Sequence, residues 1–352
     1  MAKKIIFCAD GTWNHPKSSA LVSDCDTNVY KLYKLLAVTA TQVPFYDDGV
    51  GVESDLLRHL LGGAFGDGLF RKVKDGYTAI AHVYEAGDAI AIFGFSRGAY
   101  TARSVAGMIA GCGLPTKGFD QHLVDTTFAA YRNRDQRQQI LSTLTAYNLV
   151  NASITAVGVW DTVGSLGIPV DFIGLNHAVY GFLDTKLHPD VQSAFHAVAI
   201  DERRVEFPAT LWTPPFAPGQ IVKQAYFTGV HCDVGGGYAE TGLSDITLSW
   251  MLQKALEAGG NNKLELLPAA DAFLTIDPKH ALDKAHESWN LIWGFPKHRT
   301  IANDAVISNS VSLRIAEDQH YRPPNLNTQN GKLGGSYGTE MVLSPASKKA
   351  SG

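Results

Sequence analysis

The stretch at residues 88–104 constrains the fold of this chain most strongly. Its first part, 89–93, is an apolar run of the kind found in strands buried inside a sheet. The motif G-F-S-R-G follows at 94–98, and the small residues after it predict a helix over 99–109. A strand, a G-x-S-x-G turn and a helix in this order form an elbow that exposes the serine hydroxyl above the sheet, and its glycines let strand and helix approach closely. We therefore interpret Ser96 as a nucleophile.

Strands alternate with helices along the rest of the chain, which favours an α/β fold with a doubly wound, mostly parallel sheet. We expect one catalytic domain over 1–326, with lid or cap insertions at 52–70 and 116–150, and a loosely ordered tail at 327–352 that is rich in Gly, Ser, Asn and Lys. The further strands are predicted at 5–8, 42–46, 154–160, 194–200 and 222–230, and the further helices at 27–40, 71–85 and 243–258.

Polar residues gather where the predicted strands end. In doubly wound sheets, ligands bind outside the carboxyl ends of the strands, so this gathering predicts one active site. The residues concerned are Asp10, Asp47, Ser96, Asp161, Asp201 and His231.

A serine nucleophile needs a base, and the base needs a carboxylate that fixes its tautomer. His231 follows the last predicted strand and opens a glycine-rich loop, which suits the base. Asp161 and Asp201 both lie at strand ends before it, and the residues alone leave the choice of acid open. The order serine, acid, histidine is that of the α/β-hydrolases.

Other residues could support this chemistry. The backbone amide of Arg97 opens the helix after Ser96, and an amide of Gly11 or Thr12 would complete an oxyanion hole, unless the loop after Asp10 is a plain turn. The D-G-T sequence of that loop also occurs in haloacid-dehalogenase phosphatases, but Cys8 stands where those enzymes carry their nucleophilic aspartate. Asp233 would orient the His231 loop or bind a metal, although a metal is the less favoured interpretation.

Composition excludes several classes of function. The net charge of −4 and the scattered Lys and Arg residues provide no footprint for nucleic acid. The four cysteines form no C-x-x-C pair, and Cys8 and Cys112 lie in apolar runs, as in buried thiols of a protein made in the cytosol. We expect no signal peptide and no transmembrane segment, which leaves open export by a route that needs no cleaved signal.

Several motifs recur in one order along the chain. They are FCADGTWN (7–14), YDDGVG (46–51), GDAIAIFGFSRGAYTAR (87–103), VGVWDTVGSLGIP (157–169), AIDERR (199–204), TGVHCDVGGGY (228–238) and SVSLRIAEDQHYRPPNL (310–326). In these motifs the chain resembles a family of α/β-hydrolase-like proteins, once known only as a domain of unknown function, that includes phospholipase effectors of bacterial type VI secretion. The resemblance implies a triad of Ser96, Asp161 and His231, which favours Asp161 over Asp201. It also implies a glycerophospholipid substrate and an immunity or accessory protein as a partner.

We thus expect a cofactor-independent serine esterase or lipase that acts on acyl esters of lipids and contacts membrane surfaces. The apolar segments 56–70 and 289–295 are candidates for that contact, although core packing is the commoner use of such residues. Three alternatives remain. They are a soluble esterase for short or carbohydrate-linked acyl groups, a non-catalytic binding module on the same fold, and a metal-dependent hydrolase that uses Asp10, Asp47 and His231.

Overall fold

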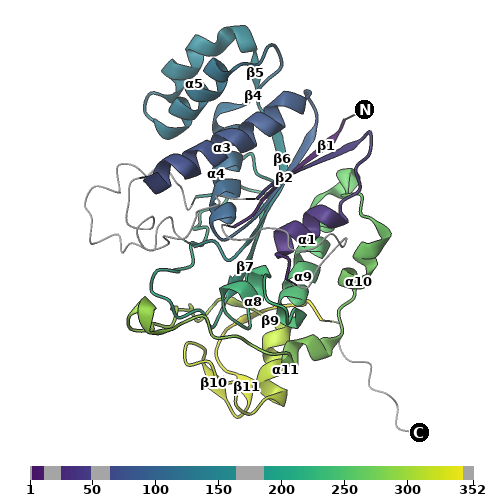
Figure 1. Ribbon diagram of the computed structural model, residues 1–352, viewed down its shortest axis with the longest axis vertical. Helices are drawn as coiled ribbons and strands as arrows, with labels where there is room; N and C mark the ends of the chain where they lie inside the picture. The colour runs from purple at the N-terminus through teal and green to yellow at the C-terminus, as the bar shows by residue number, and fades with distance from the viewer. Residues whose placement is uncertain (1, 12–24, 49–63, 164–185, 344–352) are drawn as a thin grey trace.

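The computed structural model describes residues 2–11, 25–48, 64–163 and 186–343. Within these residues the chain forms a central eight-stranded sheet in which every paired strand runs parallel to its neighbour (Figure 1). From one edge to the other, the strands are β12 (Gly338–Glu340), β9 (Val306–Ser308), β8 (Ile221–Phe227), β7 (Ser193–Ala199), β6 (Ser153–Trp160), β3 (Ala89–Phe95), β1 (Lys4–Ala9) and β2 (Gln42–Asp47).

Helices cover both faces of this sheet, because its inner strands are apolar on both sides. In β1, Ile5 and Phe7 enter one buried cluster, with α3 (Ala64–Val83), α4 (Arg97–Cys112) and α5 (Gln121–Arg132). Ile6 and Cys8 enter the cluster on the opposite face, with α1 (Asn28–Leu35) and α9 (Gly242–Ala258). The predicted doubly wound α/β class, of the α/β-hydrolase type, is therefore confirmed. The remaining helices are α6 (Arg137–Leu141), α8 (His231–Gly235), α10 (Asp271–Leu274), α11 (Asn309–Glu317) and the 3₁₀ turns η1 (Ser142–Tyr147), η2 (Gly260–Asn262), η3 (Pro268–Ala270), η4 (Pro278–Leu282) and η5 (Leu291–Trp293).

The direction of winding reverses at β1, which lies between β2 on one side and β3 on the other. Such a reversal opens a crevice at the carboxyl ends of the strands, where doubly wound proteins bind ligands. The start of α4 packs directly on this crevice, since a Cβ added at Gly98 would lie 2.1 Å from the Ala9 carbonyl oxygen. A Cβ at Gly94 would lie 2.4 Å from the Gly98 oxygen, so both glycines of the elbow are needed for close approach.

Two helix boundaries differ from the prediction. The helix predicted to continue to residue 40 ends at Leu35, because Leu36 turns to an extended conformation and the Ala37 amide pairs with the Glu265 carbonyl. The α3 helix begins at residue 64, seven residues before its predicted start. The last part of the expected lid at 52–70 therefore belongs to α3, and 49–63 lies outside the described residues.

The predicted insertion at 116–150 is an excursion closed by the short pair β4 (Leu114–Pro115) and β5 (Leu149–Val150). It carries α5 and α6 and begins just after the C-terminal end of α4 (Figure 1). The excursion therefore lies at the opposite end of α4 from Ser96, which precedes the first residue of that helix.

The prediction of a loosely ordered tail from residue 327 is wrong as far as residue 343. Residues 328–333 form the hairpin β10 (Thr328–Gln329) and β11 (Lys332–Leu333), and β12 adds the edge strand of the main sheet. The buried Glu340 accepts a hydrogen bond from Trp250 Nε1 at 3.1 Å, which ties this strand to α9. The domain therefore extends past its predicted end at 326, and 344–352 lies outside the described residues.

Candidate active site

Ser96 lies at the turn between β3 and α4, as the elbow motif predicts. Its backbone adopts φ 58° and ψ −121°, a combination that a residue with a side chain adopts only under strain. The Trp160 carbonyl accepts a hydrogen bond from the Ser96 amide at 3.1 Å, which fixes the turn against β6. The residue is partly exposed at the carboxyl edge of the sheet, where a ligand can reach it.

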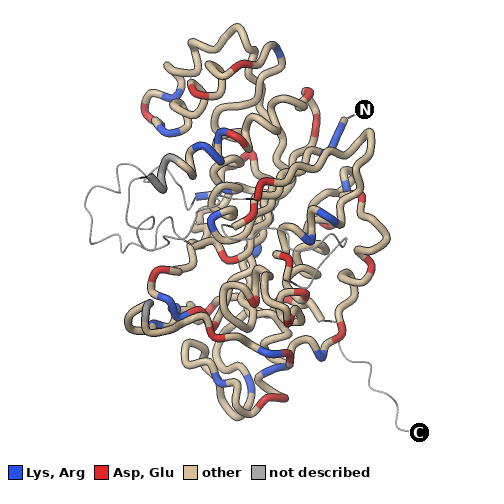
Figure 2. Tube along the Cα trace, viewed as in Figure 1, with Lys and Arg blue, Asp and Glu red and all other residues tan. Residues whose placement is uncertain are grey.

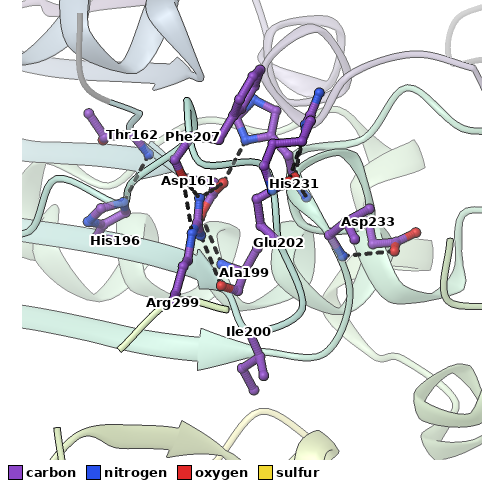
Figure 3. Close-up of polar contacts among 12 residues, drawn as sticks. Asp161, Thr162, His196, Ala199, Ile200, Glu202, Phe207, His231, Asp233 and Arg299 are labelled. Atoms are coloured by element: carbon purple, nitrogen blue, oxygen red, sulfur yellow. Dashed lines mark hydrogen bonds and ion pairs between the residues drawn. The ribbon is translucent and has the colours of Figure 1, made fainter. Parts of the chain in front are cut away.

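His231 and Asp161 form a buried pair (Figure 3). His231 Nδ1 lies 2.6 Å from Asp161 Oδ2. Burial by itself would raise the pKa of Asp161, but Arg299 and His231 together hold it well below its usual range. Because the carboxylate is therefore ionised, His231 Nδ1 carries the hydrogen that is shared, and Nε2 is the nitrogen able to accept a proton.

A guanidinium that the sequence analysis did not single out completes this pair. Arg299 Nη1 and Nη2 lie 2.6 Å and 3.0 Å from the two Asp161 oxygens, and Arg299 also donates to the Ala199 and Phe207 carbonyls (Figure 3). The Ala199 amide donates to Asp161 Oδ1 at 2.9 Å. The carboxylate is thus held from several sides in one orientation.

Glu202, in the predicted AIDERR motif, is also part of the site. It is fully buried, and its Oε2 accepts a hydrogen bond from the His231 amide at 3.3 Å. Burial would raise the pKa of Glu202, but hydrogen bonds and charge from Arg204 lower it to about 2. Ser288 also donates to both carboxylate oxygens, so Glu202 fixes the start of α8 in place.

A second histidine lies behind Asp161 but is unsuited to act as a base. His196 is fully buried in β7, and its Nε2 accepts a hydrogen bond from the Thr162 amide at 3.0 Å. Burial, the largest effect, lowers the pKa of His196 to about 3, so the ring is neutral at physiological pH. His196 is therefore unsuited to exchange a proton with a ligand near neutral pH.

Asp201, the other candidate acid, does not contact His231. It accepts hydrogen bonds from the Gly229 amide at 2.6 Å and from the Tyr321 hydroxyl at 2.9 Å. Asp233 likewise has structural partners. It accepts hydrogen bonds from the Val230 amide and from His286, whose Nδ1 lies 2.6 Å away. Both carboxylates thus brace the loop that carries His231.

Asp10 holds the loop after β1. Its carboxylate accepts hydrogen bonds from the Tyr46 hydroxyl at 2.8 Å, the Thr27 hydroxyl and the Gly11 amide at 2.7 Å. The Gly11 amide predicted for the oxyanion hole is therefore bonded to Asp10 in this structure, and Thr12 lies outside the described residues. The Arg97 amide occupies the first position of α4, at the positive end of the helix dipole.

The described residues contain no group of three or more histidine, cysteine or acidic side chains arranged to hold a metal ion. Asp47, a ligand in the metal-dependent alternative, forms an ion pair with Lys72. Cys8 and Cys112 are buried free thiols, as predicted.

A cavity of about 360 Å³ runs along α4, starting at Tyr100, one helical turn after Ser96. Its described lining combines Trp212 with the cations Arg103, Arg134, Arg137 and Lys186. Arg134 and Arg137, which belong to the excursion at 116–150, thus form part of the lining of this cavity.

The sequence of residues 3–254 matches the profile of a family described as "T6SS, Phospholipase effector Tle1-like, catalytic domain". The chain belongs to this family. The family's description names a phospholipase effector, which agrees with the resemblance that the motifs indicated. Arg299 and the strands β9 and β12 lie beyond the matched residues.

Similar proteins are known from a fungus and from bacteria. An uncharacterized protein of Saccharomyces cerevisiae is 30% identical over 243 residues, which cover 61% of this chain and 34% of that protein. The chain therefore spans about a third of the length of this curated relative.

No helix among the described residues of the chain is long and apolar enough to cross a membrane.

Two solved structures are also similar. An uncharacterized protein from Pseudomonas aeruginosa is 19% identical, with a TM-score of 0.48, over 80% of this chain and 50% of that one. The Tle1 effector bound to the VgrG spike of the type VI secretion system is 16% identical, with a TM-score of 0.34, over 67% of this chain and 51% of that one.

Proposed function

We propose that the chain hydrolyses acyl esters of glycerophospholipids by a serine mechanism. Two observations support the proposal: Ser96 has a strained backbone at the turn after β3, and His231 pairs with a buried, ionised Asp161. The ring of Phe95, the residue before Ser96, has its centre 4.6 Å from that of the His231 ring. Family membership supports lipid ester hydrolysis as the reaction.

In the proposed first step, Ser96 Oγ bonds to the ester carbonyl carbon while His231 Nε2 takes the hydroxyl proton. The imidazolium so formed is stabilised by Asp161, and the Arg97 amide at the positive end of α4 faces the developing oxyanion. Collapse breaks the bond to the alcohol, which leaves with the proton from His231. Water then attacks the acyl carbon while His231 Nε2 takes a proton from it. The bond to Ser96 Oγ breaks, His231 returns the proton to Ser96, and the fatty acid leaves without the help of a cofactor.

Within the described residues no hydrogen bond joins the Ser96 hydroxyl to His231. This agrees with a resting enzyme, because catalytic hydrogen bonds often become short only when a substrate or transition state is bound. The phospholipid, a type VI delivery route and an immunity or accessory protein are further parts of this proposal, and family membership is what supports them.

The test compares fatty-acid release from phosphatidylethanolamine vesicles with hydrolysis of a short soluble ester. We expect Ser96→Ala to lower both rates by roughly 10⁴-fold or more. Ser142→Ala, which changes an exposed serine in η1, is the matched control and retains both activities. Full activity in Ser96→Ala would refute the serine mechanism and favour a non-catalytic role for this site.

Two outcomes identify the alternatives. Rapid turnover of the soluble ester without lipid release would indicate an esterase for short or carbohydrate-linked acyl groups. Loss of activity on treatment with a chelator would indicate the metal-dependent hydrolase, whereas the serine mechanism predicts an unchanged rate.

A further inference from the structure

The loop at 289–297, with sequence WNLIWGFPK, exposes large apolar side chains to an unusual degree. The exposed fractions are 87% for Leu291 and 93% for Phe295, the highest among the large exposed hydrophobic side chains of the described residues. Exposing such side chains to water forgoes the stabilisation that burial brings, so neighbouring apolar side chains displayed in this way indicate a surface that meets a partner.

The loop is held in this shape by its own contacts. Trp289 Nε1 donates to the Gly294 carbonyl at 3.0 Å, which closes the loop, and the Lys297 amide donates to the Arg203 carbonyl. The Arg203 guanidinium lies 5.7 Å from the centre of the Trp289 ring. The apolar tip is thus presented on a supported base (the yellow-green turn around η5 in Figure 1).

Two ring contacts connect this loop to the proposed catalytic base. The Phe207 ring lies 5.2 Å from the His231 ring and 5.8 Å from the Trp293 ring. The Arg204 guanidinium lies over Phe207 at 3.6 Å and over Trp293 at 5.3 Å. The loop therefore stands at the rim of the site, and a surface that covers its tip lies close to His231.

The charge of the loop indicates which surface this is. No acidic residue occurs from Ser288 to Asn303, while Lys297 is exposed beside the tip. At the base of the loop, where Figure 2 shows cations and carboxylates side by side, Arg203 pairs with Glu287 and Arg204 with Glu202, so Lys297 is the cation nearest the tip. Tryptophan with apolar neighbours and flanking cations is the combination that partitions into the headgroup region of membranes, and cations favour anionic lipids.

We propose that the 289–297 loop docks the protein on an anionic lipid bilayer, with Leu291 and Phe295 inserted at the boundary between headgroups and acyl chains. This inference rests on the proposed function and deepens it, because it names the segment that presents the site to its substrate. Docking would place the bilayer beside the ring contacts that lead to His231.

The test measures binding to vesicles in the Ser96→Ala background, so that it requires no catalysis. The probes are sedimented vesicles of phosphatidylcholine with and without phosphatidylglycerol. We expect Leu291→Ser and Phe295→Ser each to weaken partitioning by about tenfold or more, the change expected from one apolar side chain. Lys297→Gln should reduce the preference for phosphatidylglycerol, and salt should reduce it in the unsubstituted loop.

Val38→Ser is the matched control, because Val38 is 78% exposed but lies between α1 and β2. It should partition as the parent does. The proposal would be overturned if the Leu291→Ser/Phe295→Ser double variant bound vesicles as well as the parent does. It would also be overturned if the parent did not bind vesicles and instead dimerised through these residues. Vesicle binding that depends on the loop, together with a wild-type protein that hydrolyses neither lipid nor soluble ester, would leave the docking surface standing and refute only the proposed function.

Discussion

Replacement of Arg299 by glutamine tests how the buried carboxylate of Asp161 is maintained. The substitution removes the two hydrogen bonds of 2.6 Å and 3.0 Å and their charge, but leaves Asp161 buried with His231 and the Ala199 amide. Breaking a buried ion pair by removing one partner costs about 3–5 kcal/mol, because the remaining charge is uncompensated. We expect a loss of unfolding free energy in this range at pH 7.

The pH dependence of this loss has a definite sign. Arg299 and His231 outweigh the effect of burial and hold the pKa of Asp161 below that of an unfolded aspartate, so the pair stabilises the fold above about pH 4. That contribution is lost as the pH falls and the carboxyl is protonated. The difference between wild type and Arg299→Gln should therefore be largest at neutral pH and shrink below about pH 4.

Urea unfolding at pH 7 and at pH 3.5 measures both quantities. Arg203→Gln is the matched control, since its partner Glu287 is half exposed and surface pairs contribute about 1 kcal/mol or less. If Arg299→Gln does not fold, Arg299→Lys replaces it. A loss below 1 kcal/mol, or the same loss at both pH values, would refute the argument.

Three further predictions follow from other contacts. Asp161→Asn should lower kcat on a soluble ester by on the order of 10⁴-fold, since the amide favours the wrong tautomer of His231, and a loss below tenfold would contradict this. Burial raises the pKa of Asp201 to about 6, so the folded protein binds this proton more tightly than the unfolded chain and loses up to about 3 kcal/mol as the pH rises from 3.8 to 6. Asp201→Asn should flatten that slope in urea unfolding, and an unchanged slope would count against the assignment. Gly98→Ala should cost more than about 2 kcal/mol in thermal unfolding, because its Cβ meets backbone, whereas Gly111→Ala meets only the movable end of Arg137 and should cost less.

The central strands and the positions that follow them could be predicted from the sequence, because a buried parallel strand is a continuous apolar run and its end is marked by the first polar residues. This pattern predicts the strand-end positions of four residues, all of which lie at the carboxyl edge of the sheet: Asp10, Ser96, Asp161 and His231. The residues alone could not separate Asp161 from Asp201, since the difference lies in three-dimensional contacts with His231 and Tyr321.

Other features leave no local signal. The strands β9 and β12 have three residues each, too few for a hydrophobic period to be recognised. Arg299 is 138 residues from Asp161 and lies in a segment without regular structure, so its pairing depends on the whole fold. Glu202 stood within a quoted motif, but its burial against the His231 amide depends on Arg204 and Ser288 together.

The position of Arg299 has a consequence for the order in which the protein is made. A chain emerges from the ribosome from its N-terminus at roughly 5–20 residues per second. Ser96, Asp161 and His231 are therefore synthesised well before Arg299, β9 and β12. Until those later residues emerge, Asp161 cannot be enclosed without leaving a buried carboxylate that lacks its guanidinium. The surroundings of Asp161 are thus completed only after Arg299 has emerged, well after every residue of the proposed triad.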